Sequence, residues 1–249
     1  MTNQSDHSAR RFEIEGKNLG YPTDFRDGSS IMGLFVVSAS EANALIAESG
    51  FEVAKIAPGR AFFSLSCVHY TDSDCGVYEE IALSFFVKKM GQSSRLPYLS
   101  TWLDIQRGQI ASYTWRLPVT SKLALDAGVF MWGFPKTIED IDYENTNGHA
   151  TFTWRSGGRK VLRYSVPAQG TRQPATISAP VYSIFEGSPH VSYLTQTYGD
   201  TGYRFRGGIL QLGDHSIADE LRCLGLPRRP LFSTWNGHLS FQMSAPEKL

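Results

Sequence analysis

Lys136 is the only charged residue in an apolar run. The run extends from Val129 to Ile138 and reads Val-Phe-Met-Trp-Gly-Phe-Pro-Lys-Thr-Ile. Burial of an ammonium group disfavours its charged form, so a lysine in these surroundings is expected to have a lowered pKa. A neutral amine attacks carbonyl carbons and forms Schiff bases. Pro-Lys pairs also occur in turns whose ammonium group stays in solvent, so the residues alone leave both interpretations open.

Glu79 is the second residue with chemical potential. It belongs to an alternating segment in which one strand face would carry Val77, Glu79, Ile81, Leu83, Phe85 and Val87. A carboxylate on an apolar face needs a partner or a raised pKa, because unpaired burial is costly. Glu79 could also lie in water at the start of the strand. The same alternation predicts that Glu80 points the other way, into solvent.

Two arginines are candidates for binding a substrate carboxylate. Arg26 and Arg116 each carry a guanidinium fork that fits a carboxylate in a bidentate manner, although either could be a solvated surface residue. His69, Asp72 and Asp74 have a spacing common in hairpin turns, so no metal site is predicted there. The sequence contains no G-x-S-x-G elbow, Walker A loop or dinucleotide G-x-G-x-x-G. We therefore expect neither a metal nor an organic cofactor.

The segments around these residues predict mostly strands. Residues 63–69 and 77–87 would form two strands joined by a turn at 71–76. Thr120 or Ser121 caps a short predicted helix through Ala127, with Gly128 as its stop, and this helix leads into the lysine run. Residues 98–107 could form a further strand.

Turn and cap signals mark the rest of the chain. Asn147-Gly148 and Gly157-Gly158 predict hairpin turns. Ser38 to Glu41 has a capping-box pattern that begins a helix, and Ser216 begins another. Many strands with few short helices indicate an α+β, β-rich fold. We expect a polar N-terminal arm over residues 1–28 and one domain over residues 29–249.

Composition excludes several classes of function. The 249 residues include 24 basic and 24 acidic residues without a block of like charge, so neither a nucleic acid nor a membrane surface is an expected partner. Cys67, Cys75 and Cys223 contain no C-x-x-C pair, which argues against a disulfide framework and a zinc site. Residues 1–11 lack the apolar stretch of a signal peptide, and no window approaches 18 apolar residues. A cytoplasmic location is expected.

Residues 132–136, Trp-Gly-Phe-Pro-Lys, resemble the lysine motif of the acetoacetate decarboxylase family. The similarity continues upstream over residues 69–79 and downstream from Leu210-Gln211-Leu212-Gly213-Asp214-His215, and with gaps it extends from about residue 30 to residue 245. In that family a lysine activated by apolar burial and a cationic neighbour forms the Schiff base. This mechanism is therefore an implication of the resemblance.

The resemblance also implies a fold, an activity and a set of site residues. The implied fold is an antiparallel β cone or barrel around a central cavity. Lys136 would form the Schiff base with a small keto acid and Glu79 would carry the proton. Arg26 and the pocket-wall residues Met131, Trp132 and Phe134 would bind substrate, although such aromatic residues are often plain core. Release of carbon dioxide without a cofactor and assembly into a homo-oligomer are further expectations from the family.

Two departures from the family pattern leave the reaction open. Thr137 replaces the family's second lysine, and Ser64 occupies the place of a second acidic residue. The leading hypothesis is a decarboxylase. A lysine-dependent aldolase or dehydratase acting on another oxo acid is the alternative within enzymes, because the same imine serves these reactions. A non-catalytic barrel that binds a small carboxylic acid is the alternative outside them.

Overall fold

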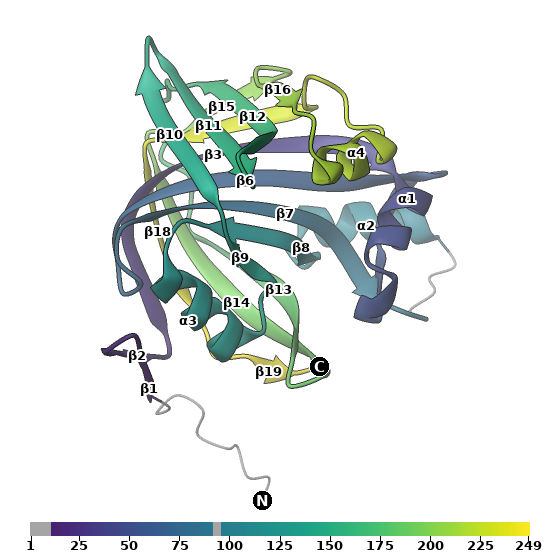
Figure 1. The fold of residues 1–249 in the computed structure, drawn as a ribbon. Coiled ribbons are helices and arrows are strands. Elements are labelled where there is room, and N and C mark those ends of the chain that lie inside the picture. The colour runs from purple at the N-terminus through teal and green to yellow at the C-terminus, as the bar shows by residue number, and fades with distance from the viewer. Residues whose placement is uncertain (1–10, 92–95) are drawn as a thin grey trace, which may run out of the picture.

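The computed structural model describes residues 11–91 and 96–249, most of which lie in β-strands (Figure 1). The strands are β1 (Arg11–Ile14), β2 (Lys17–Gly20), β3 (Thr23–Ser38), β4 (Phe51–Val53), β5 (Lys55–Ala57), β6 (Arg60–Ser73), β7 (Tyr78–Lys89), β8 (Ala111–Val119), β9 (Lys136–Ile138), β10 (Asp140–Thr146), β11 (His149–Ser156), β12 (Arg159–Pro167), β13 (Ile177–Phe185), β14 (Ser188–Gly199), β15 (Gly202–Phe205), β16 (Ile209–Leu212), β17 (Phe232–Asn236), β18 (His238–Met243) and β19 (Glu247–Lys248). The helices are α1 (Ala39–Leu45), the short 3-10 helix η2 (Ala47–Ser49), α2 (Pro97–Gln106), α3 (Lys122–Trp132) and α4 (Ser216–Cys223).

The largest sheet closes into a ring. Its strand order is β15-β17-β3-β18-β14-β13-β8-β7-β6-β5, and β3 pairs with β6 as well. Seven strands from β3 through β18, β14, β13, β8 and β7 to β6 therefore return to β3. Most pairs are antiparallel, but β8 is parallel to β13 and to β9. The β-rich prediction is confirmed, whereas the antiparallel barrel is corrected to a ring of mixed direction with additional edge strands.

A four-stranded sheet packs on the outside of this ring. It has the order β10-β11-β12-β16, and Figure 1 shows it above β3, β6 and β7. We call the apolar layer between the two sheets the outer core; it includes Phe35, Phe63, Phe85, Phe152 and Trp154. The hairpin turns at Asn147-Gly148 and Gly157-Gly158 are confirmed, and all four residues adopt the positive φ that such turns require.

A second apolar cluster lies inside the ring. We call it the inner core, and it comprises Ile14, Leu19, Phe25, Val68, Tyr70, Cys75, Tyr78, Leu117, Val119, Ala124, Ala127, Met131, Trp132, Phe134, Val181, Leu239, Phe241 and Met243. Alternate residues of β7 thus face two different apolar layers, one on each side of the sheet. Neither face of β7 therefore lies wholly in water.

Helix α3 carries the chain from β8 to β9. Ser121 caps it by accepting a hydrogen bond from the Ala124 amide, as predicted. The predicted stop at Gly128 is wrong, because the helix continues to Trp132 and ends where Gly133 adopts φ 69°. Since this crossover returns the chain in its original direction, β9 lies parallel to β8.

Two other segments differ from the sequence prediction. Residues 98–107 belong to helix α2 and its C-terminal cap instead of a strand, with Pro97 in the first turn, where proline suits a helix. Within the predicted N-terminal arm, residues 11–20 form the β1–β2 hairpin and β3 begins at Thr23. Residues 1–10 lie outside the described part of the chain. No helix among the described residues is long and apolar enough to cross a membrane.

The turn at Gly133 gives a stability prediction. A methyl group there would overlap the backbone of Ile184 in β13, whereas one at Gly225, which follows α4 with φ 76°, meets nothing within 4 Å. Both substitutions to alanine strain a left-handed residue by about 1 kcal/mol. We expect Gly133→Ala to lower the unfolding free energy by about 3 kcal/mol and Gly225→Ala by about 1 kcal/mol in urea titrations. Equal losses would contradict the close packing of α3 on β13.

Candidate active site

Lys136 is the first residue of β9 and is held against helix α3. Its backbone pairs with Leu117 of β8, and its side chain is only 7% exposed. The methylenes of Lys136 pass over Gly128, where a Cβ atom would overlap Lys136 Cδ and Cε. Only glycine leaves room for the Lys136 side chain at this position of α3. This packing requirement explains a glycine in a helix interior despite its low helix propensity. The apolar burial predicted for Lys136 is confirmed.

Glu80 is the ion-pair partner of Lys136. Lys136 Nζ lies 2.7 Å from Glu80 Oε2, and the Glu80 side chain is 13% exposed. The Tyr78 ring also faces the ammonium group, with its centroid 5.5 Å from Nζ. Removing one member of such a buried pair leaves an uncompensated charge and typically costs about 3–5 kcal/mol. The prediction that Glu80 points into solvent is wrong, because the inner core covers that face of β7.

Two stacked tyrosines complete this cluster. The Tyr70 hydroxyl donates to Glu80 Oε1 at 3.1 Å, and the rings of Tyr70 and Tyr78 stack at 4.5 Å. Burial, followed by the nearby Glu80 carboxylate, raises the pKa of both phenols well above the usual value. Both therefore remain protonated at neutral pH. Tyr70 engages one oxygen of Glu80 and leaves the other to Lys136, so the carboxylate has a fixed orientation.

Glu79 makes a separate set of contacts on the opposite face of β7. Its Oε1 lies 2.9 Å from His69 Nδ1, and its Oε2 accepts a hydrogen bond from Thr120 Oγ1 at 2.8 Å. The His69 ring stacks on Tyr143 of the outer sheet. The expected partner for a buried Glu79 is thus present, but the structure joins it to His69 and not to Lys136.

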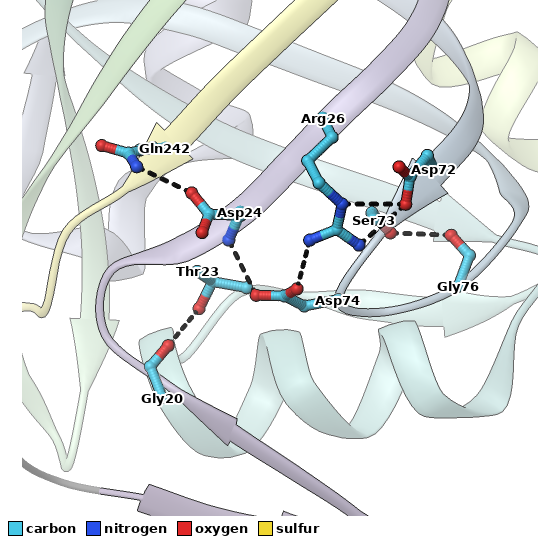
Figure 2. Close-up of polar contacts among 9 residues, drawn as sticks. All are labelled: Gly20, Thr23, Asp24, Arg26, Asp72, Ser73, Asp74, Gly76 and Gln242. Atoms are coloured by element: carbon cyan, nitrogen blue, oxygen red, sulfur yellow. Dashed lines mark hydrogen bonds and ion pairs between the residues drawn. The ribbon is translucent and has the colours of Figure 1, made fainter.

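Arg26 lies on the outside of the ring. Figure 2 shows its guanidinium between two carboxylates: Nε donates to Asp72 Oδ1 at 2.9 Å and Nη1 donates to Asp74 Oδ1 at 2.7 Å. These hydrogen bonds, with Asp72 first and Asp74 second, raise the pKa of the guanidinium. The side chain is 47% exposed, and neighbouring Phe25 is the residue that faces the inner core. The structure does not bring Arg26 to Lys136.

The other predicted arginine has a partner elsewhere. Arg116 Nη2 donates to Glu220 Oε2 of α4 at 2.7 Å, and its guanidinium lies over Trp115, which packs against the outer core. An open groove of about 470 Å³ lies on this outer side of β8, and its lining residues include Trp115, Glu220 and Ser49 but neither Lys136 nor Glu80.

Met131, Trp132 and Phe134 are brought together in the inner core. The Trp132 indole donates to the Ser244 carbonyl at 2.8 Å and its ring stacks with Phe134, while Tyr21 donates to the Met131 carbonyl. These bonds fix the end of α3 and hence the turn into Lys136. Their proposed contact with substrate stays a prediction.

The two residues that depart from the family pattern, Thr137 and Ser64, have different positions relative to the Lys136–Glu80 pair. Thr137 is exposed on β9, where side chains alternate, so it does not share the face of Lys136. Ser64 pairs with Ser84 of β7, which places it on the same face as Glu80. Cys75 of the inner core interacts electrostatically with Lys136, and burial first of all raises the pKa of its thiol to about 11. It is therefore a neutral thiol at physiological pH.

Sequence reasoning missed Glu80, Tyr70, Tyr78 and Gly128. One signal in the sequence could have grouped three of them. Alternation places the even-numbered residues of the two paired strands on one face, and these include Tyr70, Tyr78 and Glu80. Gly128 carried none, since its role depends on a side chain from another element. Among residues 11–91 and 96–249, no three His, Cys, Asp or Glu side chains gather as potential metal ligands.

Gly128 gives a prediction about the geometry of the site. Glycine to alanine inside a helix ordinarily stabilises a protein by about 1 kcal/mol. We expect Gly128→Ala to give no such gain in urea titrations, because the methyl group must displace Lys136 from Glu80. Modification of Lys136 by an amine reagent, followed by peptide mapping, should become faster than in the unsubstituted protein. An ordinary gain in stability with unchanged reactivity would contradict this packing.

Comparisons with known proteins agree with this architecture. The model of the family described as Acetoacetate decarboxylase (ADC) matches residues 14–239. The crystal structure of acetoacetate decarboxylase from Legionella pneumophila is similar with a TM-score of 0.68 and 15% identity, over 99% of this chain and 94% of that chain. An acetoacetate decarboxylase-like enzyme from Sphingomonas wittichii RW1 gives a TM-score of 0.59 and 15% identity, over 94% of this chain and 96% of that chain.

A third similar structure is the enduracididine biosynthesis enzyme MppR, complexed with the condensation product of pyruvate and imidazole 4-carboxaldehyde. It has a TM-score of 0.57 and 14% identity, over 92% of this chain and 90% of that chain. No curated protein sequence matches this chain. At these identities the structural similarities establish the fold, while the family match covers most of the chain. This protein therefore belongs to the acetoacetate decarboxylase family.

Proposed function

We propose that this protein is an enzyme that forms a Schiff base between Lys136 and a small keto acid and releases carbon dioxide. The observation that carries the proposal is the Lys136–Glu80 pair, 2.7 Å long and enclosed by the inner core. An amine and a carboxylate in direct contact can exchange a proton without passing through bulk water. Transfer to Glu80 leaves a neutral amine that can attack a ketone.

The proposed reaction consumes one proton for each carbon dioxide released. The Lys136 amine adds to the ketone carbon, and loss of water gives a protonated imine. The bond between the carboxylate and the adjacent carbon then breaks, its electron pair enters the imine, and carbon dioxide and an enamine form. The proton that Glu80 accepted from Lys136 leaves with the water lost on imine formation, so Glu80 takes up a second proton from solvent and delivers it to the enamine carbon. Water then hydrolyses the resulting protonated imine, which frees the ketone and restores the Lys136 ammonium group. A β-keto carboxylate and one proton thus give a ketone and carbon dioxide.

We assign the proton transfer to Glu80 in place of Glu79. The two side chains leave β7 on opposite faces, and Glu79 is engaged by His69 and Thr120. The apolar surroundings of the pair also favour loss of carbon dioxide, because a carboxylate removed from water is less stabilised than the neutral product.

A second candidate is an aldolase or dehydratase that uses the same imine. The MppR structure holds a condensation product of pyruvate with an aldehyde, and Thr137 and Ser64 remove family charges from this chain. Support for this alternative would be an acetoacetate imine on Lys136 whose mass still includes the carboxylate.

The experiment that tests the proposal is borohydride trapping with acetoacetate and pyruvate, read by intact mass and peptide mapping. We expect a reduced adduct on Lys136 whose mass shows that acetoacetate has lost carbon dioxide. Lys136→Arg should give no adduct. If the folded protein gives no adduct with either acid, imine chemistry is excluded and a non-catalytic binding protein becomes the better account.

The two adjacent glutamates can be compared directly. Glu80→Gln retains shape but removes the proton acceptor, so we expect the turnover of acetoacetate to fall by about 100-fold or more. Glu79→Gln should change turnover far less, because its contacts lie on the other face of β7. Initial rates of carbon dioxide release measure both. A larger loss in Glu79→Gln would reverse the assignment.

Tyr70 gives a prediction about positioning. Tyr70→Phe removes the donor to Glu80 Oε1 and keeps the stacked ring, and a hydrogen bond to a charged group is worth about 1.5–3 kcal/mol. We expect kcat to fall by about 10-fold or more with little change in KM, because Glu80 loses the contact that fixes its orientation toward Lys136. Tyr198→Phe is the matched control, since its part-buried hydroxyl donates to Gln196 Oε1 at 2.7 Å. Similar kinetic losses in both variants would indicate a structural effect alone.

A further inference from the structure

The inner face of the ring carries buried hydroxyl groups that have no hydrogen-bond partner. Among the described residues, five buried side-chain polar atoms lack one: Tyr78 Oη, Arg116 Nε, Trp154 Nε1, Ser183 Oγ and Ser192 Oγ. Buried polar groups are nearly always hydrogen-bonded, and one left unpaired costs about 1–3 kcal/mol. Three of the five are hydroxyls on the same side of the sheet as Lys136, so this concentration requires an explanation.

Ser183 and Ser192 are neighbours on two paired strands. In the β13–β14 pair Val181 lies opposite Ser192, and Ser183 follows two residues later on β13. Residues two apart share a face, and Val181 belongs to the inner core, so both serines point into the ring. Their exposures are 3% and 1%, so bulk water does not reach them.

These two serines flank the turn that leads to Lys136. Gly133 packs directly on Ile184, the residue after Ser183. Trp132 donates to the Ser244 carbonyl, and Ser244 in turn pairs with Tyr193, the residue after Ser192. The end of α3 thus contacts β13 beside Ser183, and it is joined to β14 beside Ser192 through Ser244.

Among the described residues, neither arginine singled out by the sequence lies in the inner core. Arg26 is held outside the ring by Asp72 and Asp74, and Arg116 is held by Glu220 on the outer side of β8. The charge of Lys136 is matched by Glu80. Hydroxyl groups are donors of suitable chemistry for carboxylate oxygens when no guanidinium is present.

We propose that Ser183 and Ser192 form the binding site for the carboxylate of the keto acid that reacts with Lys136. This inference rests on the proposed function. Two neutral donors orient the carboxylate without supplying a counter-charge. A guanidinium would stabilise the carboxylate in the bound substrate and so oppose its departure as carbon dioxide, whereas hydroxyls impose a smaller penalty on that step.

The test combines stability with ligand selectivity. Ser183→Ala and Ser192→Ala remove hydroxyls that are unpaired in the free protein, so we expect urea unfolding to show no loss of stability. With acetoacetate, the half-saturating concentration for borohydride trapping should rise about 10-fold in each variant, as expected for the loss of one hydrogen bond to a charged group. With acetone, which lacks the carboxylate, it should not change.

Ser165→Ala is the matched control. Its hydroxyl accepts a hydrogen bond from Thr151 at 2.9 Å in the outer sheet, so this variant should lose stability and retain wild-type trapping of both compounds. If the Ser183 and Ser192 variants behave in the same way, their hydroxyls are satisfied within the protein and the proposed site is wrong. An equal change with acetone and acetoacetate would also overturn it.

Failure of the proposed function is distinguishable from failure of this inference. Titration calorimetry with 3-hydroxybutyrate, which has the carboxylate but no ketone, measures binding without imine formation. Weaker binding in the two serine variants than in wild type supports the carboxylate site even if Lys136 is never trapped. Trapping on Lys136 together with unaltered 3-hydroxybutyrate binding in those variants would remove the serine site and leave the Schiff base.

Discussion

The buried ion pair between Lys136 and Glu80 is the interaction on which the site depends. An ammonium group and a carboxylate that are 7% and 13% exposed are stable in an apolar interior only when they contact each other. Their 2.7 Å contact fixes the end of a flexible lysine side chain, and Tyr70 fixes the other carboxylate oxygen. The pair is also the chemically useful arrangement, because it joins a nucleophile to its proton acceptor.

The β8–α3–β9 segment and its contacts determine the position of Lys136. The β8–α3–β9 crossover brings Lys136 beside Leu117, and two glycines make this geometry possible. Gly128 leaves space for the lysine methylenes on α3, and Gly133 lets the helix end against the backbone of β13. A neighbouring element constrains both positions. At Gly128 this constraint outweighs local helix propensity, which would favour alanine.

Two consecutive residues of β7, Glu79 and Glu80, lie in different chemical environments on opposite faces of the strand. Glu79 contacts His69 and Thr120 beneath the outer sheet, while Glu80 contacts Lys136 and Tyr70 inside the ring. Alternation predicted that the two carboxylates point in opposite directions, and this is confirmed. It also suggested that the face of β7 carrying Glu80 is exposed to solvent. This is wrong, because apolar layers cover both faces of the strand.

Local features of this protein follow from residue type and short spacing alone. They include the lysine motif with its family resemblance, the β-rich class, the cap at Ser121 and the two glycine hairpins. Long-range packing determines which carboxylate meets Lys136, why Gly128 lies within a helix, and that Arg26 is engaged outside the ring. Lys136 and Glu80 are 56 positions apart and Arg26 and Asp72 are 46 apart, whereas Gly128 and Lys136 are close in the chain but belong to different elements. A one-dimensional pattern records which residues share a face but not which element covers that face.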